Sequence, residues 1–257
     1  MIYKALVLGC GAIGSTLSEN IYSSGFPTHA SAYIKSKKTK LVGMCDKNII
    51  KAQKATKFWN MGKPFSDLDT ALNETKPEIV SICTPDEYHY EDLVKVIEFG
   101  TVKAVFAEKP LTINYEDAKY IKKLSKDSNV KVAVNYTRRY SKNIQKIREA
   151  INEGAIGEIN SVIGHYTKGI LHNGTHWIDL SRLLIGEIKK VQAVSPPLDY
   201  FNNDPTLDVK IEYKNKARGL LIAHKHKNLT IFEMDIIGSN GRFRIIDDGN
   251  KIEYYQL

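Results

Sequence analysis

Cysteine is scarce in this chain of 257 residues, and its three cysteines form no C-x-x-C pair. Cys10, Cys45 and Cys83 each lie at the end of an apolar run, so we expect buried, reduced thiols and neither a disulfide framework nor a zinc site. Long apolar stretches are lacking too, because no run approaches the roughly 18–20 residues that a membrane span needs. The N-terminal MIYKALVLGCGAIG meets glycine too early for a signal peptide. We therefore expect a cytoplasmic protein without a membrane partner.

Negative charge is in deficit, with 29 Asp and Glu against 37 Lys and Arg, a formal net charge of +8. The densest basic patch, Lys35, Lys37, Lys38 and Lys40, contains no aromatic residue or arginine. Nucleic-acid surfaces usually interleave such residues with a basic run, so a solvated lysine face is the favoured interpretation. We expect no nucleic-acid partner, although the charge balance suits anionic, phosphate-bearing small molecules.

The first half of the chain alternates strand-like and helix-like segments. The expected strands are short apolar runs: Ala5–Leu8, Leu41–Cys45, Ile79–Cys83, Val102–Ala107 and Val130–Val134. The expected helices are Ser15–Tyr22, Asn48–Phe58, Glu87–Phe99 and Tyr115–Ser125. Strands that are apolar on both faces and alternate with helices indicate a parallel sheet covered on both sides. Residues 1–135 are therefore predicted to form a doubly wound, Rossmann-type domain of the α/β class.

The pattern changes from about Ser141. A helix (Asn143–Glu153), a strand (Ile159–Tyr166) and a helix within HNGTHWIDLSRLLIG are followed by strand-like stretches alone. Those stretches are Val191–Val194, Asp208–Tyr213, Gly219–His224, Phe232–Ile237, Phe243–Ile246 and Ile252–Tyr255. Consecutive strands without intervening helices favour an antiparallel sheet. Residues 136–257 are thus predicted to form a smaller α+β domain with an open, mostly antiparallel sheet, for substrate binding and oligomerisation.

A glycine motif, Gly9-Cys10-Gly11-Ala12-Ile13-Gly14, follows the first expected strand. Between a strand and a helix, such glycines let the backbone turn tightly and let a pyrophosphate approach, whereas the alternative is a glycine turn without a cofactor. The second strand ends in Asp46, whose carboxylate can accept hydrogen bonds from ribose hydroxyls and would repel a 2′-phosphate, which favours NAD over NADP. Asp46 lies further from Gly14 than the roughly twenty residues usual for this motif, and we expect the excess in a loop over Ser23–Tyr33.

Polar residues also follow the third and fourth strands. Thr84-Pro85 ends the third strand, with His89 shortly after, and Glu108-Lys109-Pro110 ends the fourth. Ligands on such sheets lie beyond the carboxyl ends of the strands, so one crevice is expected to hold Gly9, Asp46, Thr84 and Lys109. A lysine in that place can polarise a carbonyl or stabilise an alkoxide.

Residues 169–180, GILHNGTHWIDL, place His172 and His176 four apart, with Asp179 three further on. On a helix these side chains share one side, where they could hold a metal ion, form a base with an orienting partner, or simply begin a helix. H-x-x-x-H is a zinc spacing, which keeps a metal-dependent hydrolase as a rival hypothesis. Gly174 weakens a helix there and no H-E-x-x-H glutamate is present, so we expect no metal.

Seven motifs occur in order: GCGAIG at 9–14, MCD ending at Asp46, TPDEYH at 84–89, EKP at 108–110, NYTRRY at 135–140, INEGAIGEI at 151–159 and G-x-H-x-x-D at 174–179. Over roughly residues 1–190 the chain thereby resembles the glucose–fructose oxidoreductase / inositol dehydrogenase / rhizopine-catabolism (Gfo/Idh/MocA) family of NAD(P)-dependent oxidoreductases. The resemblance implies hydride transfer between a nicotinamide cofactor and a secondary hydroxyl or carbonyl of a sugar, polyol or nucleotide sugar. It also points to surface-polysaccharide biosynthesis as a setting.

The resemblance implies roles for particular residues. In the family, the lysine of E-K-P lies beside the nicotinamide and the substrate, its proline is often in a cis peptide, and the histidine of D-x-G-x-H acts on the reacting hydroxyl. The catalytic candidates are therefore Lys109 for alkoxide stabilisation, His176 as base and His172 as a relay or substrate contact, while Asp179 could orient His176. The cofactor-binding candidates are Gly9, Gly11, Ala12, Ile13, Gly14, Asp46, Thr84, Pro85, His89, Glu108 and Lys109. The substrate-binding candidates are Lys109, Arg138, Arg139, Tyr166, His172 and His176, with Lys168 as a further contact.

Two departures from the family pattern matter. His172 stands where D-x-G-x-H has an aspartate, and an imidazole does not provide the same permanent negative charge. The chain also stops at Leu257, short of most members, so a reduced C-terminal sheet is expected. The open sheet commonly forms a subunit interface in the family, which implies a homodimer or homotetramer. These departures keep a second hypothesis open, a non-catalytic NAD-binding sensor or assembly subunit.

Overall fold

The computed structural model of the chain describes residues 1–16, 28–227 and 229–256. They belong to two compact units, Met1–Asn135 and Tyr136–Leu257. Among these residues, no helix is both long and apolar enough to cross a membrane. Each unit has its own sheet and its own buried core.

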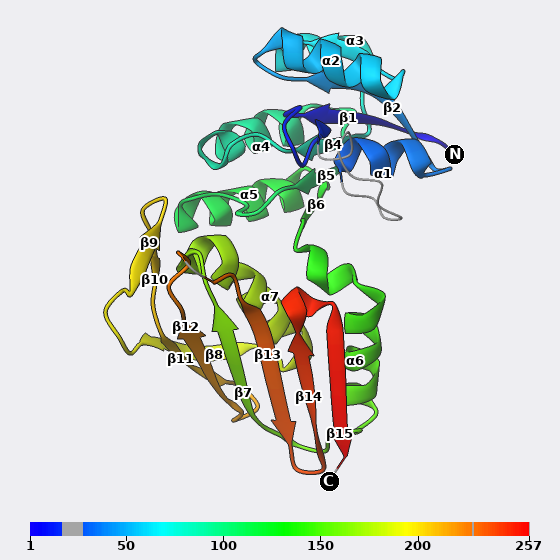
Figure 1. Cartoon of the computed structure of the whole chain (residues 1–257). Helices are drawn as coiled ribbons and strands as arrows, with labels where there is room; N and C mark the ends of the chain where they lie inside the picture. The colour runs from blue at the N-terminus through cyan, green and yellow to red at the C-terminus, as the bar shows by residue number, and fades with distance from the viewer. Residues whose placement is uncertain (17–27, 228, 257) are drawn as a thin grey trace. The chain divides into compact units, whose positions relative to one another are not determined.

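The first unit contains a six-stranded, entirely parallel sheet in the order β3-β2-β1-β4-β5-β6 (Figure 1). Its strands are β1 (Tyr3–Leu8), β2 (Thr39–Cys45), β3 (Lys63–Phe65), β4 (Ile79–Ile82), β5 (Ala104–Ala107) and β6 (Lys131–Val134). The chain order reverses beside β1, which has β2 on one side and β4 on the other. In open α/β sheets such a reversal places a crevice at the carboxyl ends of the strands.

Helices cover both faces of this sheet. They are α1 (His29–Lys35), α2 (Ile49–Trp59), α3 (Leu68–Thr75), α4 (His89–Glu98) and α5 (Tyr115–Asp127), and a 3₁₀ turn (Asp86–Tyr88) precedes α4. Alternate residues of β1 enter opposite cores: Ala5 and Val7 pack with α1 and α2, and Leu6 and Leu8 pack with α3 and α4. Burial on both faces is why these strands read as continuous apolar runs, and the predicted doubly wound fold is confirmed.

The segment after the glycine motif differs from the prediction. Residues 17–22 of the predicted helix and 23–27 of the predicted loop lie outside the described residues, but residues 29–33, also predicted as loop, begin α1. Thr28 caps this helix: its hydroxyl accepts from Ser31 N–H, and Ser31 Oγ accepts from Thr28 N–H. This reciprocal cap uses serine at the position where glutamate is the usual signal, so the sequence pattern did not reveal it.

The second unit contains a seven-stranded sheet in the order β15-β14-β13-β7-β12-β11-β8. Its strands are β7 (Ile159–Tyr166), β8 (Ile188–Ala193), β11 (Val209–Tyr213), β12 (Arg218–Ala223), β13 (Phe232–Gly238), β14 (Gly241–Ile246) and β15 (Lys251–Gln256). The pairing is antiparallel except between β7 and β12, which confirms a mostly antiparallel sheet. A separate hairpin, β9 (Asp199–Phe201) and β10 (Asp204–Thr206), was not predicted because each strand has only three residues.

Two helices, α6 (Lys142–Asn152) and α7 (Thr175–Leu184), cover one face of this sheet, and the other face carries no helix of the described part of the unit (Figure 1). Trp177 fixes α7 against β7, because its fully buried indole fills the space over Gly164 and its Nε1–H donates to the Glu233 carbonyl at 3.1 Å. A Cβ on Gly164 would lie 2.0 Å from that nitrogen. The Gly164–Trp177 contact therefore fixes the position of α7 on the sheet, and with it the position of His176, the residue before Trp177.

Candidate functional site

A cleft of about 510 Å³ opens in the first unit at the carboxyl ends of β1, β2 and β4. Of the predicted cofactor residues, Gly9, Gly11, Asp46, Thr84 and Pro85 line it. Residues that the sequence analysis did not single out complete the lining, among them Lys47, Lys51, Asp67, Tyr88, Asp92 and Lys95. Of the four residues predicted to share one crevice, Gly9, Asp46 and Thr84 line this cleft. Lys109 is not among the lining residues and lies two residues beyond the end of β5, the strand next to β4.

The three glycines of the motif have different surroundings. A Cβ on Gly9, whose φ is +92°, would lie 2.4 Å from the Cys83 carbonyl oxygen, and a Cβ on Gly14 would lie 1.9 Å from the Gly9 carbonyl oxygen. Gly11 has no heavy atom within 4 Å of its Cβ position, although it lines the cleft. Gly9 and Gly14 therefore make the tight turn, whereas Gly11 leaves open space for a ligand. Ala12 and Ile13 between them are exposed.

Asp46 connects the end of β2 to the glycine loop. Its Oδ2 accepts from Cys10 N–H and its Oδ1 from Asn48 N–H, each at 2.9 Å. Each carboxylate oxygen keeps a further acceptor position, so Asp46 can still take hydrogen bonds from a ligand in the cleft. Lys47, the next residue, places its ammonium 3.6 Å from the centre of the Tyr88 ring. Negative and positive groups thus stand side by side at this end of the cleft.

The three cysteines, of which Cys45 and Cys83 line the cleft, are protonated thiols at neutral pH. Burial, followed by the charge of Asp46, raises the pKa of Cys10 to about 12, and burial with the charges of Asp67 and Asp46 raises the pKa of Cys45 to about 12. Burial also raises the pKa of Cys83. All three cysteines are free, as the sequence predicted, and their raised pKa values make them poor nucleophiles.

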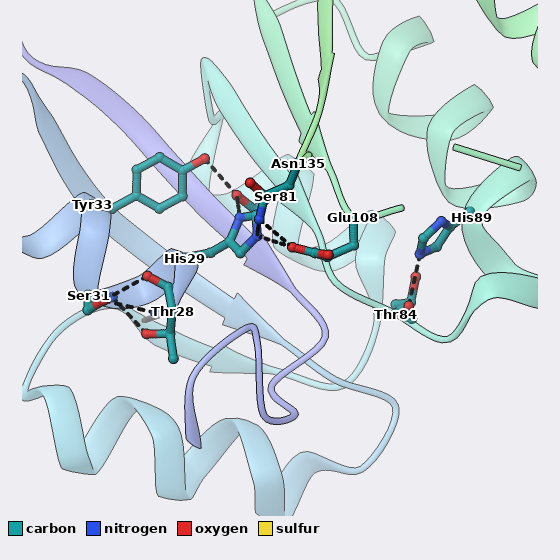
Figure 2. Close-up of polar contacts among 9 residues, drawn as sticks. All are labelled: Thr28, His29, Ser31, Tyr33, Ser81, Thr84, His89, Glu108 and Asn135. Carbon is teal, nitrogen blue, oxygen red and sulfur yellow. Dashed lines mark hydrogen bonds and ion pairs between the residues drawn. The ribbon is translucent and has the colours of Figure 1, made fainter. Parts of the chain in front are cut away.

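His89 has a role other than the predicted cofactor contact. Its ring is fully buried, with Nδ1 2.7 Å from the Pro110 carbonyl oxygen and Nε2 2.9 Å from the Thr84 carbonyl oxygen (Figure 2). Both nitrogens therefore face the backbone, so His89 ties the end of β4 to the turn after β5 and presents no atom to the cleft. Thr84 turns its hydroxyl to Asp92, to which it donates at 2.7 Å.

Glu108 is held by two side chains inside the first unit. His29 Nε2 and Asn135 Nδ2 lie 2.9 and 2.6 Å from the same carboxylate oxygen (Figure 2). Burial acts to raise the pKa of Glu108, but the hydrogen bonds from His29 and Asn135, together with the charge interaction with His29 and the Lys109 backbone N–H, leave the pKa below its ordinary value. Glu108 is thus an ionised acceptor, and the Lys109–Pro110 peptide that follows is cis, as the resemblance implied.

In the second unit, the stretch around His172 is a π-helical turn, Gly169–Gly174, that leads directly into α7. Asp204 of β10 fixes this turn, because its carboxylate accepts from Leu171 N–H at 2.9 Å and from His172 N–H at 2.8 Å. A Cβ on Gly169 would lie 1.9 Å from Asp204 Oδ2, so glycine is required there. His172 is exposed and its ring packs 4.9 Å from that of Phe201 on β9.

His176 lies in the first turn of α7 and is half-buried. The Tyr136 ring packs edge-on against its imidazole, with 5.6 Å between ring centres. Asp179, considered as its orienting partner, instead forms a two-point ion pair with Arg139: Nε to Oδ2 at 3.0 Å and Nη2 to Oδ1 at 2.6 Å. The hydrogen bond with Asp179 raises the pKa of Arg139. The suggested orienting role of Asp179 is therefore corrected to pairing with Arg139.

Three further substrate candidates are engaged within the second unit. Arg138 lies 3.7 Å from the centre of the Phe232 ring and donates to the Asp248 carbonyl, and burial lowers its pKa. Tyr166 is fully buried, and its hydroxyl donates to the Leu207 carbonyl and accepts from Leu207 N–H. Arg138, Arg139 and Tyr166 thus serve packing and pairing, whereas Lys168 sits at the start of the π-helical turn with a φ of +65°.

No cluster of three His, Cys, Asp or Glu side chains that could hold a metal ion occurs in the described residues. The rival metal hypothesis needed His172, His176 and Asp179 together, and Asp179 is bonded to Arg139.

Several residues to which the sequence analysis assigned no role contribute to these sites. Asn135 directly follows β6, and the strand-end rule that found Thr84 and Lys109 could have found it. No local sequence pattern marks the other residues, because their partners lie far away in the sequence. They are His29, Ser81, Tyr136 and Asp204.

A parallel sheet with a glycine loop and a carboxylate at its switch point defines a dinucleotide-binding protein. The sequence also matches the family described as "Oxidoreductase family, NAD-binding Rossmann fold" over residues 3–136, and the "GFO/IDH/MocA C-terminal domain" over residues 144–244. The chain belongs to this Gfo/Idh/MocA family, as the motifs indicated, and its first unit is an NAD-binding Rossmann domain.

Two curated relatives illustrate the similarity. The D-glucoside 3-dehydrogenase of Escherichia coli (strain K12) is 29% identical over 131 residues, 51% of this chain and 37% of that protein. The inositol 2-dehydrogenase of Rhizobium meliloti (strain 1021) is 27% identical over 195 residues, 70% of this chain and 54% of that protein. The aligned region thus spans about a third to a half of these relatives' own length.

Solved structures share the fold. The WlbA dehydrogenase from Bordetella pertussis, in complex with NADH and UDP-GlcNAcA, aligns with 100% of this chain and 82% of its own, at a TM-score of 0.85 and 21% identity. A scyllo-inositol dehydrogenase from Lactobacillus casei with NAD(H) and scyllo-inositol aligns with 96% of this chain and 77% of its own, at a TM-score of 0.79 and 21% identity.

Proposed function

We propose that this protein is an NAD-dependent oxidoreductase that transfers a hydride between the cofactor and a secondary hydroxyl or carbonyl of a sugar, polyol or nucleotide sugar. The observation that carries the proposal is the set of strand ends in the first unit. The glycine loop, Asp46 and Thr84 line one cleft, and Lys109 follows the strand next to that of Thr84. The similarity to glucoside and inositol dehydrogenases supports the substrate class.

The described residues fit NAD. The open space at Gly11 receives the pyrophosphate, and the remaining acceptor positions of Asp46 take the adenosine ribose hydroxyls. A 2′-phosphate would meet the Asp46 carboxylate, which favours NAD, although Lys47 and Lys51 line the same cleft. Because Asp46 is already held by two backbone N–H groups, its charge cannot turn away easily, and we assign it the larger effect on cofactor choice.

When bound, the nicotinamide ring of NAD would supply the hydride acceptor for the substrate carbon. The hydroxyl must lose its proton as the hydride leaves, and we assign that proton to His176, since a neutral imidazole is a competent base near neutral pH. Lys109 stabilises the negative charge that develops on the substrate oxygen. His172, exposed beside Phe201, is proposed as a substrate contact. Tyr166 is left out, because its hydroxyl is bonded to Leu207. Arg138 and Arg139 are left out as well, because their guanidinium groups already bond the Asp248 carbonyl and Asp179.

A second candidate function is a non-catalytic NAD-binding sensor or assembly subunit. The contacts of Arg138, Arg139 and Tyr166 within the second unit favour it, because they make these predicted substrate contacts less available to a sugar. This candidate predicts NAD binding without turnover of any sugar.

The assembly and the location are proposed as well. On the helix-free face of the seven-stranded sheet, Ile163, Ile222 and Ile237 are only half-buried, which suits a homodimer or homotetramer through that face. Light scattering of the purified protein would show a monomer if this proposal is wrong. Free cysteines and a nicotinamide cofactor suit the cytoplasm.

The experiment that tests the function is a thermal-shift screen followed by a turnover assay. NAD should raise the melting temperature more than NADP does at equal concentration, and Asp46→Ala should reduce that difference. Free sugars, polyols and nucleotide sugars are then added with NAD, and formation of NADH is followed by absorbance. NAD binding with no turnover on any member of the panel would favour the sensor, and absence of NAD binding would refute both candidates.

A further inference from the structure

A hydrogen-bonded chain of three buried side chains, Tyr33, Ser81 and His29, runs through the first unit to the partly buried Glu108. His29 is its centre: Nε2 lies 2.9 Å from Glu108 Oε1, and Nδ1 lies 2.7 Å from Ser81 Oγ (Figure 2). The Tyr33 hydroxyl lies 2.7 Å from the same Ser81 oxygen. The side chains of His29 and Glu108 are 3% and 16% exposed, so water competes little for these bonds.

A neutral imidazole satisfies every contact in this chain. Glu108, whose pKa is below its ordinary value, accepts, so Nε2 of His29 must carry the hydrogen. Nδ1 then accepts from the Ser81 hydroxyl, which in turn accepts from the Tyr33 hydroxyl. The direction of each hydrogen bond follows from the previous one: Glu108 fixes the tautomer of His29, and the Ser81 and Tyr33 hydroxyls, which can donate or accept, adapt to it.

The backbone of His29 is tied to the glycine loop. His29 N–H donates to the Ile13 carbonyl and Ala30 N–H to the Gly14 carbonyl, each at 3.1 Å. One residue therefore joins the loop that makes the pyrophosphate end of the cofactor site to the residue directly before Lys109. Asn135 N–H also bonds the Ala107 carbonyl, at 2.8 Å, which holds the end of β5 from the other side.

We propose that His29 is a positioning residue for Lys109: it holds Glu108, and with it the strand end that carries Lys109, at a fixed place relative to the glycine loop. This inference rests on the proposed function for the role of Lys109, but the coupling itself concerns only the first unit. His29 touches neither substrate nor reacting atoms in this account. It acts through Glu108.

Loss of the His29 bond changes the charge state of Glu108. The groups that face this carboxylate are His29 from α1, Asn135 after β6 and the buried thiol of Cys83 after β4. Without the imidazole, Asn135 is left as the side-chain donor, and burial raises the pKa of the carboxyl. Glu108 then takes up a proton at a higher pH than in the wild type, and Lys109 loses the fixed negative neighbour.

Two substitutions at position 29 test the hydrogen bonds of the two ring nitrogens separately. His29→Gln places an amide donor near the site of Nε2 and can still bond Glu108, whereas His29→Asn reaches only toward Ser81. His29→Ala and Glu108→Gln, alone and together, complete the set. Thr75→Ala is the matched control, because Thr75 is also buried in the first unit and its hydroxyl donates to the Ala71 carbonyl of its own helix.

We expect kcat to fall about 30-fold in His29→Ala and His29→Asn, as for a small misplacement of a reacting group, and to recover to within about 5-fold in His29→Gln. The acid limb of the pH profile of kcat should move up in the alanine variant. In the Glu108→Gln background, His29→Ala should add less than about 2-fold. A folded His29→Ala protein with unchanged kcat and pH profile would overturn the proposal, as would equal losses with and without Glu108.

A binding measurement separates this inference from the proposed reaction. NADH carries the nicotinamide that Lys109 is proposed to face, and ADP-ribose lacks it. His29→Ala should weaken NADH binding by about 5-fold or more and ADP-ribose binding by less than about 2-fold. Equal weakening of both would show that His29 supports the glycine loop alone and would refute the positioning role. If the wild-type protein turns over no substrate, the oxidoreductase proposal fails. The comparison of NADH and ADP-ribose binding still tests the role of His29 in that case.

Discussion

The two units hold their polar candidates in different ways. In the first unit, Gly11, Asp46 and Thr84 stand at the ends of parallel strands and line an open cleft. In the second unit, Arg139 and Tyr166 bond other parts of the same unit. The carboxyl ends of neighbouring parallel strands meet at one edge of the sheet, which places their following residues at a common cleft. Tyr166, the last residue of β7 in the mostly antiparallel sheet, and Arg139, in the 3₁₀ turn Thr137–Tyr140, instead satisfy neighbours within their own unit.

The largest expected effect concerns the glycine loop of the first unit. Gly14→Ala puts a Cβ against the Gly9 carbonyl oxygen and should lower the free energy of unfolding by about 2 kcal/mol or more, with loss of NAD binding. Gly11→Ala meets no protein atom, so its melting temperature without ligand should stay unchanged while NAD binding weakens at least 10-fold. Thermal denaturation and NADH fluorescence titration measure both. Equal melting temperatures for the two variants would contradict the division between turn and ligand glycines.

The Arg139–Asp179 pair tests whether the second unit uses these residues for its fold. Asp179→Ala and Arg139→Ala should each lower the free energy of unfolding by about 2 kcal/mol, because each leaves a partly buried charge without its partner. The double variant should cost little more than either single one. Urea denaturation of all four proteins gives the coupling. Additive losses would mean that the pair does not act as a unit, and an unchanged stability with lost turnover would return Asp179 to the active site.

Tyr166→Phe should have a smaller effect. The variant keeps the ring in the core but leaves Leu207 N–H and the Leu207 carbonyl without the hydroxyl, which should cost about 1 kcal/mol. Because the hydroxyl is not offered to a substrate, KM for the sugar should be unchanged. A rise in KM at unchanged stability would reinstate Tyr166 as a substrate contact.

The smallest expected effect is a pH dependence of stability in the first unit. The folded-state pKa of Glu108 is lowered, so its ionised form stabilises the fold above the unfolded-state value, and this contribution is lost as the pH falls through the folded-state pKa. Between about pH 5 and pH 3 the melting temperature of Glu108→Gln should therefore fall less steeply than that of the wild type. Glu74→Gln, at a half-exposed carboxylate 3.7 Å from Lys63, is the control. Parallel curves of melting temperature against pH for the wild type and Glu108→Gln would contradict the claim that ionised Glu108 stabilises the fold.

Much of the first unit could be predicted from the sequence because its signals are local. The run Ala5–Leu8 is apolar at every position since β1 is buried on both faces, and the residues after it must lie at the cleft edge. The segments that were missed are short: β3 has three residues, including Pro64, and α3 has eight. In neither does the apolar pattern extend far enough to show a period.

The second unit was harder to predict because its polar contacts join distant positions. Asp204 bonds the backbone of Leu171 and His172, and Arg138 packs on Phe232. These partners lie so far apart in the sequence that no local motif predicts the contacts. The helix of His176 was found because Trp177, Leu180 and Leu184 carry a helical period. The partners of its polar face could only be seen once the sheet had brought them together.

The central claim is that Lys109 acts on substrate at an NAD site, and one pair of variants tests it most directly. Lys109→Met removes the ammonium at the carboxyl end of β5, and Lys103→Met removes an exposed one just before the other end of the same strand. Steady-state turnover with NAD and the best substrate of the panel should fall at least about 10³-fold in Lys109→Met and less than about 2-fold in Lys103→Met. NADH binding should weaken about 5-fold to 10-fold in Lys109→Met, as in His29→Ala, and by less than about 2-fold in Lys103→Met. Turnover retained in a folded, NADH-binding Lys109→Met protein would contradict the account.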